Sequence, residues 1–102
     1  MLILFTTTPT ADEAERLGNS MVAKRLAACV QILPKMTSVY FWEGKVQTDE
    51  EHLLLLKTTP EKYGELEAFI NENHSYDVPE IVAVESAKVS PKYREWLENY
   101  IA

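Results

Sequence analysis

Three short runs of consecutive apolar residues constrain the fold of this chain more than any other feature. They occupy residues 2–5, 53–56 and 81–84. Each run is bounded by polar or turn-forming residues and is shorter than a core helix, so each is predicted to be a strand. Side chains alternate between the two faces of a strand, so a strand that is apolar at every position must lose water on both faces of its sheet. The fold therefore needs cover on both sides of the sheet.

The sequence has three signals for the start of a helix. Two of them follow the first two predicted strands, and the third lies near the end of the chain. Thr10 and Glu13 have the spacing of a capping box, in which the hydroxyl accepts one orphan amide and the carboxylate reaches back. Apolar positions at helical spacing continue this helix to about residue 25. Thr59, followed by a proline, is predicted to be the N-cap of a second helix, and Ser90 repeats the arrangement before a short third one.

The region between the first two helices, residues 27–58, is predicted to be a long hairpin. Residues 29–33 and 38–42 have strand composition, and the proline between them suggests a bulge or an edge. A tight turn is predicted at residues 43–45. The second arm is expected at residues 52–57, with an acidic segment at its entry.

The predicted order is strand, helix, strand, taken twice and joined by the hairpin, with a helix at the end. Two split βαβ units in this order are typical of a ferredoxin-like α/β plait. With 102 residues, 46% of them hydrophobic, the chain has the length and composition of one globular unit. We therefore predict an α+β fold, βαββαβ plus a C-terminal helix, in a single domain over residues 1–102.

The second face of such a sheet has only the short last helix to cover it. We therefore predict an obligate oligomer whose interface includes the hairpin. Burial of several hundred Å2 of apolar surface per chain, at about 25 cal/mol per Å2, contributes several kcal/mol. The alternative is a monomer that leaves some leucines exposed, which is common in globular proteins.

Charge and cysteine content limit the partners and the compartment. Sixteen acidic residues against ten basic ones give a net charge of −6, and no three basic residues are consecutive. Nucleic acid and an anionic membrane surface are therefore not expected as partners. The one cysteine, Cys29, cannot form an intramolecular disulfide, and the first apolar run is too short for a signal peptide or a membrane helix. The protein is predicted to be soluble and cytoplasmic.

Patterns of known catalytic sites are missing from the sequence. It has no Gly-x-Ser-x-Gly and no glycine-rich phosphate loop, and Cys29 has no Lys or His beside it in the sequence. That cysteine is interpreted as a small buried hydrophobe. We therefore predict that the protein is not an enzyme and requires no cofactor.

Residues 74–80 gather the side chains best suited to hold a cation. His74, Tyr76, Asp77 and Glu80 place an imidazole, a phenol and two carboxylates in one turn-rich segment before a strand. This set is compatible with Cu2+ or Zn2+. The segment lacks a Cys pair and a His-x-x-x-His spacing, so a hydrogen-bonded structural role for His74 stays open beside metal binding.

The predicted hairpin supplies further candidates. Tyr40, Phe41 and Trp42 can floor a pocket or pack across a subunit boundary. Lys45 and Lys57 are placed to meet an anionic ligand, and the alternative for each is an ordinary surface lysine at a strand end.

Five segments in a fixed order give the sequence a resemblance to a known family. They are RLAACV at residues 25–30, SVYFWEGK at 38–45, LKTT at 56–59, HSYDVPEI at 74–81 and YREWL at 93–97. In these segments the chain resembles the CutA1 divalent-cation tolerance proteins. The resemblance implies a ferredoxin-like subunit in a homotrimer whose long hairpins wrap neighbouring subunits. It also implies a role in tolerance or homeostasis of divalent metals, copper especially.

The resemblance further implies a metal site near the subunit clefts and no catalytic reaction. The metal ligands would be His74 with Glu80 and Asp77, and the metal would be Cu2+ or another divalent cation. Thr6 and Asn73 stand where some bacterial members carry a cysteine and a histidine. The third such ligand in those members is a second histidine, at the position of His74, and it is the only one of the three present in this chain.

The resemblance also implies a ligand-binding cleft, lined by Trp42, Lys57 and Tyr76. The family shares its trimeric architecture with the PII nitrogen-regulatory proteins. The alternative function is therefore a PII-like sensor that binds an anionic metabolite or a nucleotide in this cleft. A purely structural scaffold is a third possibility.

Overall fold

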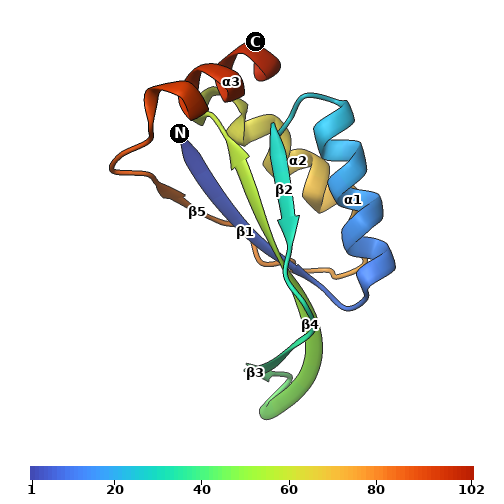
Figure 1. Ribbon diagram of the computed structural model, residues 1–102. Coiled ribbons are helices and arrows are strands. Elements are labelled where there is room, and N and C mark those ends of the chain that lie inside the picture. The colour runs from blue at the N-terminus through green and yellow to red at the C-terminus, as the bar shows by residue number, and fades with distance from the viewer.

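The computed structural model describes residues 1–102 and arranges them as an antiparallel sheet with helices packed against it (Figure 1). In chain order the elements are β1 (Leu2–Thr8), α1 (Ala11–Ala23), β2 (Cys29–Ile32), β3 (Met36–Trp42), β4 (Lys45–Thr58), α2 (Tyr63–Asn73), β5 (Val82–Glu85) and α3 (Pro91–Ile101). The strand order is β2-β4-β1-β5, and β3 pairs with the first half of β4. This is the predicted ferredoxin-like plait with a C-terminal helix, so the predicted α+β fold is confirmed.

The core lies between the sheet and the helices α1 and α2, which pack on the same face (Figure 1). Alternate residues of β1 and β4 point toward these helices, and Leu4, Leu54 and Leu56 are completely buried. The helices contribute apolar residues at helical spacing: Ala14, Leu17 and Met21 from α1, and Leu66 and Ile70 from α2. Thr6 lies in the same buried layer, and its hydroxyl has no hydrogen-bond partner.

The opposite face of the sheet is only partly covered. The C-terminal helix α3 packs over one end of it, where Leu97 and Ile101 are buried near Ala28. Val82 and Val84 of the edge strand β5 are 52% and 45% exposed. The apolar runs predict cover on both faces, and a single chain supplies it fully on one face only.

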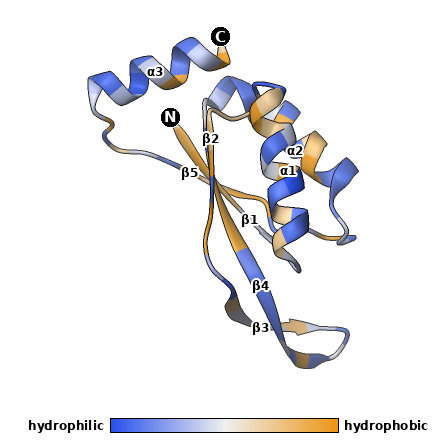
Figure 2. Cartoon of the chain, turned by 45° about the vertical axis from the view of Figure 1, so that its right-hand side comes forward, coloured by the Kyte–Doolittle hydropathy of each residue, from blue (hydrophilic) through white to orange (hydrophobic).

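The hairpin arm, formed by β3 and the first half of β4, extends away from the helices (Figure 1). Its turn has positive φ at Glu43 (51°) and Gly44 (80°), which confirms the turn predicted at residues 43–45. The prediction starts the second arm at residue 52, but β4 begins directly after the turn and runs for 14 residues. The acidic segment therefore lies inside the strand. Figure 2 shows this half of β4 as hydrophilic and the half in the main sheet as hydrophobic.

All three predicted N-cap residues start a helix or helical turn, and two of them make a capping hydrogen bond. The hydroxyls of Thr10 and Ser90 each accept a hydrogen bond from the backbone N–H three residues later. Thr59 is the N-cap of a short 3-10 turn, Pro60–Lys62, with the proline in its first turn as predicted, but its side chain makes no capping hydrogen bond. None of the helices combines the length and the hydropathy needed to cross a membrane.

Candidate functional site

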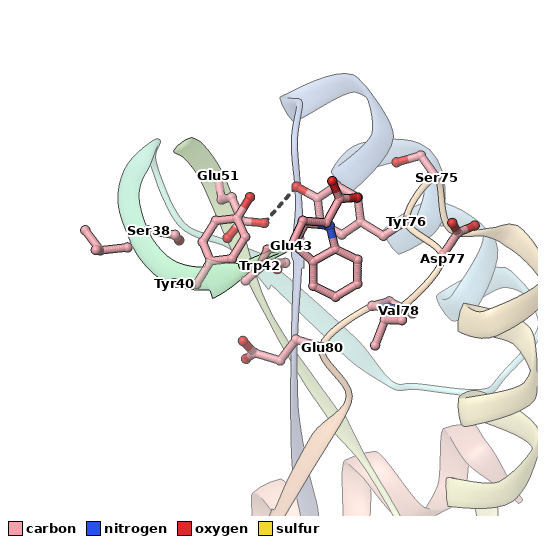
Figure 3. A pocket seen from close by; sticks show the side chains of 13 residues that line it. Ser38, Tyr40, Trp42, Glu43, Glu51, Ser75, Tyr76, Asp77, Val78 and Glu80 are labelled. Atoms are coloured by element: carbon pink, nitrogen blue, oxygen red, sulfur yellow. Dashed lines mark hydrogen bonds between the residues drawn. The ribbon is translucent and has the colours of Figure 1, made fainter. Parts of the chain in front are cut away.

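An open cleft of about 770 Å3 separates the hairpin arm from the segment that joins α2 to β5 (Figure 3). We call this segment, residues 74–81, the connecting segment, and the cavity the acidic cleft. The hairpin wall includes Tyr40, Trp42, Glu43 and Glu51. The opposite wall includes Tyr76, Asp77, Val78, Pro79 and Glu80.

The strand register explains why the hairpin side chains share one wall. Tyr40 and Trp42 are two residues apart on β3, and Asp49 and Glu51 are two residues apart on β4, so each pair points to one face. The pairing of the two strands puts both pairs on the same face. Phe41, between the two aromatic residues, points to the opposite face and is 71% exposed.

Two tyrosines of the cleft donate hydrogen bonds to carboxylates. The Tyr76 hydroxyl donates to Oε2 of Glu51 at 2.8 Å, which ties the connecting segment to the hairpin, and the Tyr40 hydroxyl donates to Asp49. Burial and the hydrogen bond to Glu51 raise the pKa of the Tyr76 phenol, and the bond to Asp49 raises the pKa of the Tyr40 phenol. Both groups therefore remain protonated donors near neutral pH.

The cleft is strongly acidic. Burial, and to a smaller extent the negative charge of Glu51, raise the pKa of the Glu80 carboxyl. Glu43 and Asp77 bring the lining to four carboxylates, and no Lys or Arg lines the cavity. Because these charges have no basic partner there, the local potential concentrates cations and excludes anions.

His74 does not line the cleft but links β1 to the connecting segment by hydrogen bonds. Its side chain is fully buried, and Nε2 donates to the carbonyl oxygen of Thr7 at 2.7 Å. Nδ1 accepts a hydrogen bond from the backbone N–H of Tyr76 at 2.9 Å. These partners assign the neutral tautomer with the proton on Nε2, which leaves no free lone pair for a metal. The structural role that the sequence leaves open for His74 is therefore the one its contacts describe.

Glu13 is a buried carboxylate that holds the same segment in place. In a capping box it would reach back to the start of its own helix, but instead its carboxylate accepts the backbone N–H of Ser75 at 3.0 Å. The carboxylate also lies 3.5 Å from Nδ1 of His74. The two contacting segments are about sixty residues apart in sequence. Sequence analysis assigns Glu13 to a cap only, because no local pattern signals a contact at that separation.

The structure brings together four of the residues predicted to bind ligands: Trp42, Tyr76, Asp77 and Glu80. Lys57 lies elsewhere. It is on the same face of β4 as Glu51, but the strand spacing puts it roughly 20 Å further along. Its ammonium group donates to Gln31 at 2.9 Å and lies 5.9 Å from the centre of the Tyr93 ring. Cys29, its partner across the strands, is half-buried.

The donors in the acidic cleft are oxygen atoms of carboxylates and phenols. No three His, Cys, Asp or Glu side chains in the chain lie close enough to hold a metal ion. The predicted set of His74, Asp77 and Glu80 is therefore not assembled within one chain. Oxygen donors without a thiolate or a free imidazole suit hard cations such as Mg2+ and Mn2+ better than copper.

Two carboxylates of the cleft, Glu43 and Glu51 of the hairpin, are not among the candidates that the sequence indicates. Both stand in segments that look like a turn and a hydrated acidic run. The alternation of side chains along paired strands is the signal that could have found Glu51. Once the turn is placed at residues 43–44, strand pairing puts Glu51 on the same face of the hairpin as Tyr40 and Trp42.

Comparisons with known proteins agree on one family. Residues 2–100 match the sequence model of the CutA1 divalent ion tolerance protein family. The chain is 46% identical over 98 residues to a protein of Arabidopsis thaliana named Protein CutA, chloroplastic. It is 41% identical over 97 residues to the divalent-cation tolerance protein CutA of Thermus thermophilus. These alignments cover 96% and 95% of the chain.

The relatives differ in length from this chain, and a solved structure of the family has the same fold. The chain spans 94% of the Thermus protein but about half of the plant relatives, 54% of the Arabidopsis protein and 55% of a rice protein. The crystal structure of CutA1 from Oryza sativa superimposes with a TM-score of 0.96 at 42% identity. That match covers 99% of this chain and 93% of the rice chain.

Proposed function

The chain belongs to the CutA1 divalent ion tolerance protein family, and from that premise we propose that it acts in divalent-cation tolerance by binding cations weakly in the acidic cleft. It does so without catalysing a reaction. The observation that carries this proposal is the lining of the cleft, which has four carboxylates and no basic side chain. The candidate ligands are divalent cations, Cu2+ among them, and the oxygen donors of the cleft suit the harder Mg2+ and Mn2+ better. The incomplete ligand set keeps the affinity low, so that bound ions exchange readily.

Within the cleft, Glu51 and Glu80 are the carboxylates that a cation would bridge. Burial and the negative charge of Glu51 raise the pKa of the Glu80 carboxyl, and a bound cation would offset that repulsion. Tyr76 holds Glu51 in position by its hydrogen bond. His74 fixes the connecting segment from below and takes no part as a ligand.

We also propose a homotrimer in which neighbouring chains cover the hairpin and the open face of the sheet. Phe41 and Val46 pair across the hairpin, form an apolar patch on its outer face and are 71% and 70% exposed. Val82 and Val84 extend the apolar surface on the open side of the sheet. Surfaces of this kind mark contacts between chains when they are contiguous. In the trimer, the acidic clefts would lie beside the subunit boundaries.

The PII-like alternative requires an anionic metabolite or nucleotide in the cleft. The charge of the lining disfavours such a ligand, because no basic side chain is present to neutralise it. Lys57, the cation implied for that role, contacts Gln31 at the other end of the sheet. Metal-cation binding is therefore the function that the geometry supports best.

Isothermal titration calorimetry with Mn2+, Zn2+ and Cu2+ tests the proposal. The double variant Glu51→Gln/Glu80→Gln removes two charges of the cleft and keeps the shape of both side chains. Glu50→Gln is the matched control, because Glu50 lies on the same strand and pairs with Lys35 on the outer side of the hairpin. We expect the double variant to bind each ion at least tenfold more weakly, while the control keeps the wild-type affinity. Equal affinity in wild type and double variant would place the cation elsewhere.

A further inference from the structure

The aromatic walls of the acidic cleft are a feature that a metal ion would not use. Tyr40 and Trp42 from β3 and Tyr76 from the connecting segment all line the cavity (Figure 3). Tyr40 and Trp42 are 41% and 45% exposed, so large aromatic surfaces meet water inside a concave site. A hydrated divalent ion binds through oxygen ligands and gains little from an indole ring. The walls therefore suit a ligand that is positively charged and partly apolar.

We infer that the acidic cleft binds an aliphatic di- or polyamine, a flexible cation whose ammonium groups are joined by methylene chains. Ammonium groups are attracted to aromatic faces, most strongly to tryptophan, and form charge-assisted hydrogen bonds with carboxylates. The methylene chain would pack against Trp42, Val78 and Pro79, which line the same cavity. This inference goes beyond the proposed binding of metal ions and does not depend on it.

The tyrosine rings are held in place before any ligand arrives. The hydroxyl of Tyr40 is fixed by Asp49 and that of Tyr76 by Glu51. The rings of His74 and Tyr76 lie with their centres 4.8 Å apart and their planes tilted by 39°, and Tyr76 also lines the cleft. Fixed rings and fixed carboxylates reduce the entropy that binding would otherwise cost.

The size of the cleft and the distribution of its charges favour more than one ammonium group. A cavity of about 770 Å3 is within the range of small-molecule sites, roughly 300–1,000 Å3. Glu43 and Glu51 belong to the hairpin wall, and Asp77 and Glu80 belong to the opposite wall. A single ammonium group can neutralise only one of these walls. A linear di- or polyamine can reach both and span the aromatic surface between them.

Spermidine is the probe for this inference, with Mg2+ as the inorganic comparison at equal ionic strength. The variant Trp96→Phe leaves Trp42 as the only tryptophan, so its fluorescence reports on the cleft. We expect a saturable change in emission with spermidine and none with Mg2+. In calorimetry, Trp42→Leu should weaken spermidine binding about tenfold while leaving Mg2+ binding unchanged.

Matched variants separate this inference from the proposed metal binding. Phe41→Leu removes the neighbouring aromatic ring on the outer face and should keep the wild-type affinity for spermidine. Glu51→Gln/Glu80→Gln should weaken spermidine, because both carboxylates contribute. Spermidine binding without metal binding would remove the proposed function and leave the inference standing. No saturable response, or equal losses in Trp42→Leu and Phe41→Leu, would overturn the inference.

Discussion

Replacing His74 by phenylalanine is the sharpest test of the role assigned to this histidine. Phenylalanine keeps a planar ring beside Tyr76 but removes both ring nitrogens. The Thr7 carbonyl oxygen and the Tyr76 backbone N–H then lose their partners, which lie at 2.7 and 2.9 Å. A buried polar group without a partner costs about 1–3 kcal/mol, so the two losses should lower the free energy of unfolding by about 2–6 kcal/mol.

Urea unfolding at one fixed protein concentration measures this loss, because the stability of the proposed trimer would depend on concentration. His52→Phe is the control. Its side chain lies half-buried on β4 and makes no hydrogen bond, so the loss should stay below about 1 kcal/mol. The folded His74→Phe protein should keep the wild-type affinity for cations. Wild-type stability together with lost Cu2+ affinity would show that the imidazole is a metal ligand, and the argument from its hydrogen bonds would be wrong.

Three further outcomes are expected. The raised pKa of Glu80 means that its ionisation weakens the folded state: its contribution is favourable below the usual carboxyl pKa and is lost as pH rises through the raised value. Glu80→Gln should therefore raise the Tm at pH 7 in a scanning-fluorimetry series, with the difference disappearing toward about pH 4. Thr6→Val replaces a buried hydroxyl that has no partner by an isosteric methyl group, and should increase the free energy of unfolding by about 1–2 kcal/mol in urea titrations. Phe41→Glu should reduce the molar mass in light scattering from that of a trimer to that of a monomer, whereas an unchanged mass would exclude this patch from the interface.

Features fixed by local chemistry could be predicted from the sequence. The hydroxyls of Thr10 and Ser90 cap their helices, and the glycine of the 43–45 turn adopts positive φ, because each depends on residues a few positions away. The three apolar runs mark the strands β1, β4 and β5, and their order determines the plait. The length of β4 escapes prediction, because its charged half is stabilised by pairing with β3 rather than by burial.

The acidic cleft depends on contacts between segments that are far apart in the chain. His74 meets Thr7 across 67 positions, and the Tyr76 hydroxyl meets Glu51 across 25. Local patterns identify Tyr76 as a candidate but cannot show that Glu51 is its partner. Lys57, which the family resemblance assigns to a cleft, contacts Gln31 at the other end of the sheet within one chain. The cytoplasmic location stays a prediction.

A cation bound between the hairpin and the connecting segment would be located by paramagnetic broadening of amide NMR signals with substoichiometric Mn2+. The broadening falls steeply with distance from the bound ion, so it reports where the ion lies. We expect the signals of Tyr40, Tyr76 and Glu80 to broaden first, while those of Cys29 and Lys57 at the other end of the sheet keep their intensity. Uniform broadening across the molecule, or broadening centred on Lys57, would contradict this expectation.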